Sequence, residues 1–278
     1  LFLPGLEEIK EIGTIAVSIE KEEQLFPCLK RREISRVYID EAAFSEEEIR
    51  TMAREIKKSG KEAGLRFRRI VRREDRGTRA SQWLQENRNS SLFAAFLFRT
   101  LDQVFALQEE RERNFFAQFD YPLYSYNSRA MEVWKAFQGD SLTFPIEFNY
   151  REDCAFSEWA EKNALSTELL VYGRLPMMVT ANCIEKTRNR CTKSNETIEL
   201  KDRQNKTMPV RLYCKFCYNQ IFNADIFSLF GLEKEIANLR PKSLRLDFTT
   251  ESRKEVEEIL RGKLPRNFTR GHFHKGIE

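Results

Sequence analysis

The stretch that decides the fold is residues 168–223, which read ELLVYGRLPMMVTANCIEKTRNRCTKSNETIELKDRQNKTMPVRLYCKFCYNQIFN. It opens with a short apolar run, residues 168–172, of the kind that forms a buried strand. The segment that follows, from about residue 175 to about residue 239, is far longer than an ordinary connection between a strand and a helix. We therefore predict a strand followed by a functional excursion or an inserted subdomain.

The excursion holds four of the six cysteines in the chain, with the spacing C-x7-C-x22-C-x2-C: Cys183, Cys191, Cys214 and Cys217. A C-x-x-C turn brings two sulfurs to the same side, and four thiolates complete a tetrahedral zinc site or hold a 4Fe–4S cluster. The pattern favours a metal or cluster site. A redox-active dithiol and unrelated free thiols are the alternatives.

Short apolar runs alternate with amphipathic segments on both sides of this stretch, which favours a parallel sheet. We predict eight strands at residues 14–19, 36–40, 65–71, 92–98, 115–119, 142–148, 168–172 and 243–248. Helices are predicted at residues 22–30, 45–58, 80–86, 102–112, 128–137, 154–162 and 251–261. Ser45 and Glu48 have the spacing of a capping box at the start of the second helix. Eight such units indicate an α/β fold, a (β/α)8 TIM-like barrel with a cysteine-rich insertion after the seventh strand.

The totals are consistent with this fold. The 278 residues match the roughly 250 of a typical barrel, and 41% hydrophobic residues with 22 Phe allow a large core. The net charge of +4, from 47 basic and 43 acidic residues, is too small to indicate nucleic acid by itself. No apolar run is long enough to span a membrane, and no secretory signal is present. Six cysteines without such a signal do not look like a secreted disulfide scaffold, and thiolate ligands need a reducing compartment, so we expect a cytoplasmic protein. We expect residues 1–12 to be a linker from a preceding domain of a longer chain and residues 13–278 to form the barrel.

Active sites of such barrels lie at the carboxyl ends of the strands, where this sequence places several polar residues. Each of them could instead be a solvated loop residue or a structural ion pair. Arginine forks suit carboxylate or phosphate ligands, and carboxylates suit proton transfer. The candidates for catalysis are Glu147, Asp120, Arg99 and Arg174. The candidates for substrate binding are Arg68, Tyr172, Asn127, Asp247 and His272.

The sequence also contains a basic run and one pair of histidines. The run at residues 66–79 reads RFRRIVRREDRGTR, which suits either a phosphate backbone or an exposed flank. His272 and His274 could bind metal, move protons or lie on the surface. The sequence has no G-x-S-x-G, H-E-x-x-H or P-loop motif.

Three segments together resemble peptidase family U32, the collagenase-like peptidases. They are YGRLPMM at residues 172–178, the cysteine set, and the ending with DFT at residues 247–249 and FTRGH at residues 268–272. The chain looks like the second, C-terminal barrel of long bacterial members. The resemblance implies a (β/α)8-like barrel and, as in several members, a 4Fe–4S cluster held by four cysteines. Those members carry out oxygen-independent hydroxylation of RNA bases or of ubiquinone precursors, while others are described as proteases.

Cys183 matches the cysteine that closes the family's strand-seven motif. Pro176 stands where the common pattern has a second cysteine, so Cys191 takes over as a ligand at a different spacing. One of Cys214 and Cys217 matches the last ligand. This departure makes zinc a rival of the cluster, because zinc accepts four-cysteine sites with varied loops.

Three functions follow as expectations. In the first, a hydroxylation enzyme or subunit acts on RNA, with Arg99, Arg174 and Arg68 binding an anionic cosubstrate such as prephenate and Glu147 or Asp120 moving protons. In the second, the chain is a collagenase-like peptidase, although four cysteines leave a metal no open position. In the third, it is a non-catalytic barrel with structural zinc.

Overall fold

Eight parallel strands form a barrel that closes when the last strand pairs with both the first and the seventh. The computed structural model describes residues 6–73, 79–110, 112–188, 191, 193–263 and 267–275. The barrel strands are β1 (Thr14–Ile19), β2 (Ile34–Asp40), β3 (Glu62–Arg66), β4 (Ala95–Phe98), β5 (Phe116–Phe119), β6 (Ser141–Thr143), β7 (Ser166–Gly173) and β13 (Ser243–Asp247). The predicted (β/α)8 barrel is therefore confirmed.

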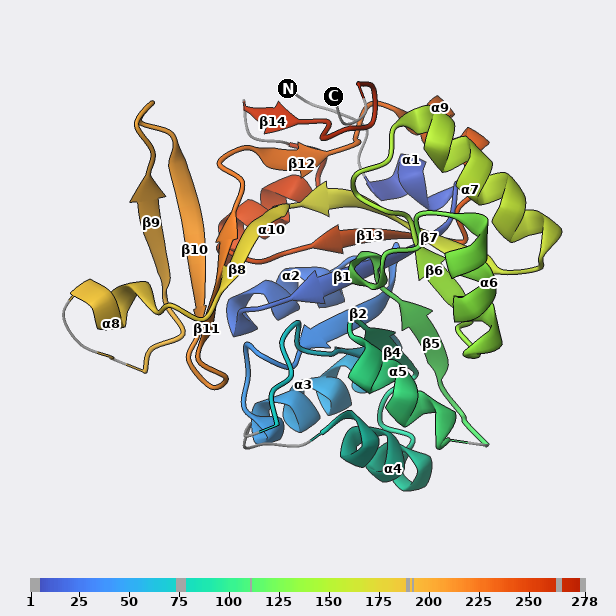
Figure 1. Cartoon of the computed structure of the whole chain (residues 1–278), viewed down its shortest axis with the longest axis horizontal. Coiled ribbons are helices and arrows are strands. Elements are labelled where there is room, and N and C mark those ends of the chain that lie inside the picture. The colour runs from blue at the N-terminus through green and yellow to red at the C-terminus, as the bar shows by residue number, and fades with distance from the viewer. Residues whose placement is uncertain are drawn as a thin grey trace.

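Helices surround the barrel (Figure 1), and all of those given next except α9 correspond to predicted helices. They are α2 (Leu25–Lys30), α3 (Glu46–Lys58), α4 (Ala80–Ser90), α5 (Leu101–Gln108), α6 (Ser128–Ala136), α7 (Tyr150–Lys162), α9 (Glu233–Asn238) and α10 (Arg253–Ile259). The predicted capping box is present, since Ser45 Oγ accepts from the amide of Glu48 and the Glu48 carboxylate accepts from the amide of Ser45.

Alternation along each strand separates two cores. Residues such as Ile15 and Val17 of β1 belong to the main core between the strands and the helices. Ala16 lies with Tyr38 in a small separate cluster on the opposite, inner face of the strands. A Cβ on Gly64 would stand 2.4 Å from the Tyr38 ring, so the tyrosine fills space inside the barrel that the neighbouring strand leaves open.

The main departures from the predicted elements are at residues 6–10, β3 and β6. Residues 6–10, expected to be linker, form helix α1 (Leu6–Lys10), whose Leu6 and Ile9 are buried in the main core. Strand β3 was expected at residues 65–71 but ends at Arg66, where the chain turns out of the sheet and the guanidinium is buried in ion pairs. Strand β6 is similarly shorter than the predicted 142–148.

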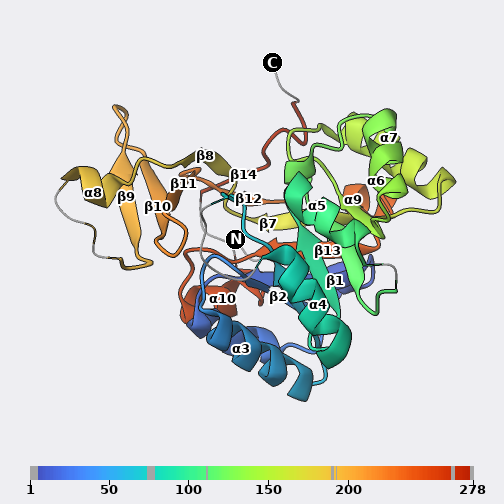
Figure 2. The same ribbon diagram turned by 60° about the horizontal axis from the view of Figure 1, so that its bottom comes forward.

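The segment between β7 and β13 forms a second sheet of four antiparallel strands beside the barrel (Figure 1). Its order is β8 (Pro176–Thr180), β11 (Tyr218–Phe222), β10 (Thr207–Tyr213) and β9 (Thr197–Lys201). Helix α8 (Ile184–Arg188) lies on the side of this sheet away from the barrel in both views (Figures 1 and 2). The chain returns through β12 (Ile226–Ser228), which pairs antiparallel with β7 and parallel with β14 (Phe268–Thr269).

Within the described residues, none of the helices has the length and apolarity needed to cross a bilayer.

Candidate functional site

The four cysteines of the excursion line one cavity of about 540 Å³. Cys183 precedes helix α8 and Cys191 follows it, whereas Cys214 and Cys217 flank the tight turn that joins β10 to β11. All six cysteines of the chain are free thiols, and the other two, Cys28 and Cys154, do not line this cavity. The fold thus brings together thiols that the sequence separates by up to 34 positions.

The C-x-x-C turn is shaped by local hydrogen bonds. The Phe216 amide donates to the Tyr213 carbonyl, and Cys217 adopts a left-handed φ of 50°. Cys214 is held on both sides, because its amide donates to the Asn195 side chain and its thiol donates to the Ser194 carbonyl at 2.9 Å. The turn therefore presents its two sulfurs from a fixed backbone.

The donor set suits a soft metal centre bound by thiolates. Burial raises the pKa of the Cys214 thiol, and the neighbouring Cys191, Cys183 and Cys217 contribute to the rise. A bound cation would reverse this effect, since a coordinating thiol is deprotonated. Within the described residues no three His, Cys, Asp or Glu side chains already stand in a ligand arrangement, so metal binding requires the thiols to draw closer together.

The barrel mouth contains a second cluster, built around a buried arginine. Arg245 of β13 is fully buried and donates to three carboxylates, to Glu168 at 2.5 Å, Asp120 at 2.7 Å and Asp247 at 2.9 Å. These partners come from the ends or interiors of β7, β5 and β13. Arg245 holds the pKa of Asp247 below its usual range despite burial, with help from Arg66.

Arg66, at the end of β3, is the other centre of this ion-pair network. Its guanidinium donates to Glu20 at 2.6 Å and to Asp40 at 2.7 Å, and it lies 3.5 Å from Asp247. Burial, together with the neighbouring Asp40, raises the pKa of Glu20 to about 7, although Arg66 and Arg211 oppose the rise. Such desolvated pairs are stable only because the charges compensate one another.

Three of the residues predicted from strand ends join this network: Arg99, Asp120 and Asp247. The Arg99 side chain lies 3.2 Å from Asp120 and 3.9 Å from Asp40, and all three are almost fully buried. The network of Glu20, Asp40, Asp120, Glu168 and Asp247 with Arg66, Arg99 and Arg245 thus has its arginines paired with carboxylates.

The remaining predicted residues are spread around the rim. Arg68 pairs with Glu41 at 2.5 Å rather than with the network. Tyr172 is fully buried and donates to Glu251 at 3.0 Å, between the rings of Phe230 and Phe248, which fits a packing role.

The other four predicted residues have their described contacts outside the ion-pair network. Asn127 is the N-cap of α6 and accepts from the Ala130 amide. Arg174 is half-buried and donates to Thr250 Oγ1 at 3.0 Å and to backbone carbonyls. Glu147 is half-buried and interacts with Tyr126, whereas His272 lies in a turn rather than on an extended segment. These four therefore do not converge with the ion-pair network through the contacts described.

The central residues Arg245, Arg66, Glu20 and Glu168 were not among the predicted site residues. A usable signal was present in SLRLDF at residues 243–248, where charged residues occupy alternate positions of an apolar strand. Positions two apart share a face, so Arg245 and Asp247 point together into the barrel. Charged residues at alternate positions of an apolar strand therefore indicate that one face of the strand lies inside the barrel.

The four-stranded sheet covers one side of this mouth. The Tyr213 hydroxyl donates to Glu20 at 2.8 Å, and Arg211 of the same strand donates to the Glu20 carbonyl at 3.0 Å. The strand that ends at Cys214 is thereby joined directly to the ion-pair network.

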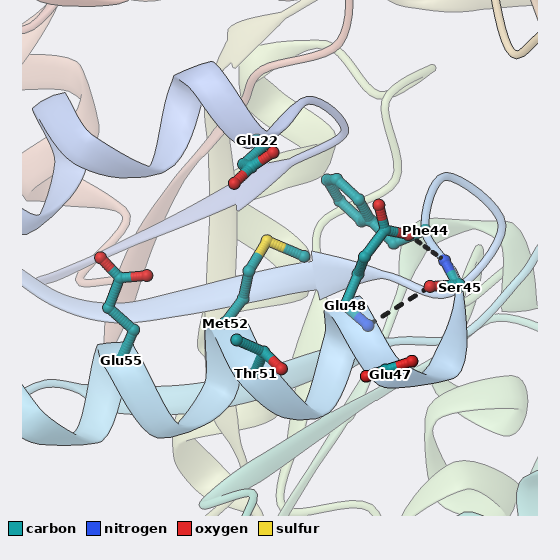
Figure 3. Close-up of a pocket in the computed structure, with 8 residues that line it drawn as sticks. All are labelled: Glu22, Phe44, Ser45, Glu47, Glu48, Thr51, Met52 and Glu55. Carbon is teal, nitrogen blue, oxygen red and sulfur yellow. Dashed lines mark hydrogen bonds between the residues drawn. The ribbon is translucent and has the colours of Figure 1, made fainter.

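A separate groove lies between α3 and the 3-10 turn η1 (Glu22–Gln24), with a volume of about 400 Å³ (Figure 3). Glu22, Glu47, Glu48 and Glu55 line it together with Phe44 and Met52. Glu48 is occupied in the capping box with Ser45, as the dashed lines in Figure 3 show. The groove has an acidic lining but no assembled set of ligands.

These features define a closed (β/α)8 barrel with a cysteine-bearing sheet on its mouth. Comparison with solved structures confirms the predicted likeness to family U32 at the level of fold. The U32 peptidase Mk0906 matches with a TM-score of 0.54 and 7% identity, over 86% of this chain and 94% of that one. A proposed fructose-1,6-biphosphate aldolase from Coccidioides immitis matches with a TM-score of 0.50 and 8% identity, over 93% and 91% of the two chains. No family model matches the chain, and no curated protein matches it.

Proposed function

We propose that this chain is a U32-type barrel protein that binds a metal centre through Cys183, Cys191, Cys214 and Cys217. One observation carries the proposal, namely that these four thiols, and neither of the other two, line a single cavity. Thiolate centres persist in a reducing compartment, so the proposal includes a cytoplasmic location.

We favour a 4Fe–4S cluster over zinc as the occupant. Four thiolates satisfy either centre, and the family resemblance implies the cluster. A cluster would supply electron transfer next to the barrel mouth. The protein would supply the four thiolates and the hydrogen-bonded backbone of the C-x-x-C turn. Zinc with four cysteines would be closed and structural, and would leave no position for a peptidase water.

The finer proposal is oxygen-independent hydroxylation of RNA, with an anion such as prephenate as cosubstrate. Its support is the cysteine cavity beside a barrel mouth that contains Arg99 and Asp120. The paired arginines limit this proposal, since an anion would have to displace a carboxylate from Arg99 or Arg68. Arg174 donates to a hydroxyl and to carbonyl oxygens in these contacts, and not to a carboxylate. Of the three candidate arginines, it is therefore the best placed to bind an anion.

A non-catalytic barrel with structural zinc is the second candidate. This candidate is favoured because the arginines of the ion-pair network are already paired with buried carboxylates. Such fully paired charges are typical of a structural element. A collagenase-like peptidase remains a third alternative, and a four-cysteine metal would not perform its chemistry.

Anaerobic purification followed by analysis of iron, acid-labile sulfide and zinc tests the proposal. We expect about four iron and four sulfide per chain, as in any 4Fe–4S site. Cys214→Ser should lose most of the metal, and Cys154→Ser, a control outside the cavity, should retain it. One zinc per chain without sulfide would select the structural alternative. Equal metal loss in both variants, or no metal in the wild type, would refute the metal centre.

A further inference from the structure

The C-x-x-C turn is fastened to two of the barrel loops by hydrogen bonds. Arg72, which follows β3, donates to the carbonyl oxygens of Phe216 and Cys217 at 3.0 and 3.2 Å. Lys215, between the two cysteines, donates to the carbonyl oxygen of Phe44 in the loop after β2 at 3.2 Å. The turn therefore takes its position from the barrel as well as from its own sheet.

Apolar and aromatic contacts strengthen this attachment. Tyr213, Phe216 and Tyr218 are each 2–3% exposed and form a cluster with Ala42 that is separate from the main core. The guanidinium of Arg68 lies 4.3 Å from the centre of the Phe216 ring, which is within cation–π range. The aromatic residues at the turn thus pack against Ala42 and Arg68, which follow β2 and β3.

A third attachment reaches the ion-pair network itself. Tyr213, the residue before Cys214, donates to Glu20 after β1, and Glu20 in turn pairs with Arg66. The other arm of the cavity carries helix α8, which lies on the side of the sheet away from the barrel (Figure 2). The half of the thiol set that consists of Cys214 and Cys217 is therefore attached to the barrel by the hydrogen bonds given above.

We propose that the β10–β11 hairpin is a latch, in which metal binding at the four cysteines and closure of the hairpin over the barrel mouth stabilise each other. This inference rests on the proposed metal centre and adds a regulatory role to it. The four thiols must move closer together to bind a metal. If the barrel already holds the C-x-x-C turn in place, less conformational entropy is lost when the metal binds. Because coupling between two equilibria is reciprocal, weakening the clamp must weaken metal binding.

The first test measures Zn²⁺ affinity of the full, reduced chain by competition with a chromophoric chelator. Tyr213→Phe removes one hydroxyl from the clamp and changes no thiol, and Tyr124→Phe, at an exposed tyrosine, is the matched control. Loss of one buried hydrogen bond predicts roughly three- to tenfold weaker binding for Tyr213→Phe. The control should bind as the wild type does.

The second test is hydrogen exchange of the same protein with Zn²⁺ and after chelation. Zn²⁺ should slow exchange in peptides that cover residues 40–45 and 66–73, and should leave the loop at residues 121–127 unchanged. Wild-type affinity in Tyr213→Phe together with metal-insensitive exchange at the mouth would overturn the latch but leave the metal centre standing. A wild-type chain that binds neither Zn²⁺ nor an iron–sulfur cluster would overturn both.

Discussion

Arg245 donates to Asp120 at 2.7 Å across the interior of the barrel, joining the last strand to the end of the fifth. Two strands that are not neighbours in the sheet are thereby linked through its centre. The pair belongs to a network whose members are almost all withdrawn from water, and its energetics can be measured by substitution.

Arg245→Met should destabilise the fold by about 3–5 kcal/mol, because it leaves three buried carboxylates without their shared partner. The measurement is the free energy of unfolding from urea titration near neutral pH. Arg129→Ala breaks the exposed pair with Glu132 and should change stability by no more than about 0.5 kcal/mol. Similar effects of the two substitutions would contradict a structural role for the network.

Glu20→Gln should flatten part of the pH dependence of stability. Burial and Asp40 oppose the ionisation of Glu20 and raise its pKa in the fold from the usual 4.5 to about 7. The folded chain therefore holds this proton to higher pH, and the contribution of Glu20 falls as pH rises from about 4.5 to about 7, by about 1.4 kcal/mol per pKa unit. Unfolding free energies of both chains at pH 5 and pH 8 measure the difference. An identical slope for the variant would show that Glu20 titrates normally.

Asp153→Asn should stabilise the protein in alkaline solution. Burial and Glu152 raise the pKa of Asp153 to about 8, and its Oδ1 is buried with no hydrogen-bond partner. Wild-type stability is thus lost as pH rises from about 4 to about 8, whereas the amide has no charge to bury. Thermal unfolding should show equal stability near pH 4 and a more stable variant at pH 9. Glu158→Gln, at an exposed position of the same helix, serves as the control.

Gly64→Ala should cost about 1–3 kcal/mol through overpacking, since the new methyl would meet the Tyr38 ring at 2.4 Å. Tyr38→Val makes room for that methyl at its own cost. In a double-mutant cycle by urea unfolding, the two substitutions together should be less damaging than the sum of their separate effects. If the two changes in unfolding free energy simply add, the cost of Gly64→Ala does not come from a clash with Tyr38.

Much of the barrel could be predicted from the sequence, because its outward-facing residues follow simple rules. The alternation of apolar runs with amphipathic segments indicated eight strands, although the bounds of β3 and β6 were wrong, and the Ser45–Glu48 spacing located the start of α3. The cysteine spacing also predicted that four thiols would meet. These features depend on local pattern, so no knowledge of distant contacts was needed.

The interior of the barrel could not be predicted in the same way. Arg66 opens the basic run that we interpreted as a phosphate contact or an exposed flank, although it ends β3 and pairs with Glu20 after β1 and Asp40 of β2. Partners so far apart in sequence cannot be paired before the strand order is known. The hydrogen bond from Tyr213 to Glu20 could not be predicted for the same reason.

The position of the cysteine sheet has a consequence for the history of such chains. β7 and β13 are hydrogen-bonded neighbours, so everything between them leaves and rejoins the barrel at one seam. An inserted module at a seam can be lengthened, exchanged or lost while the eight-stranded scaffold keeps its register. Changes within the four-stranded sheet can therefore leave the pairing of β7 with β13 intact.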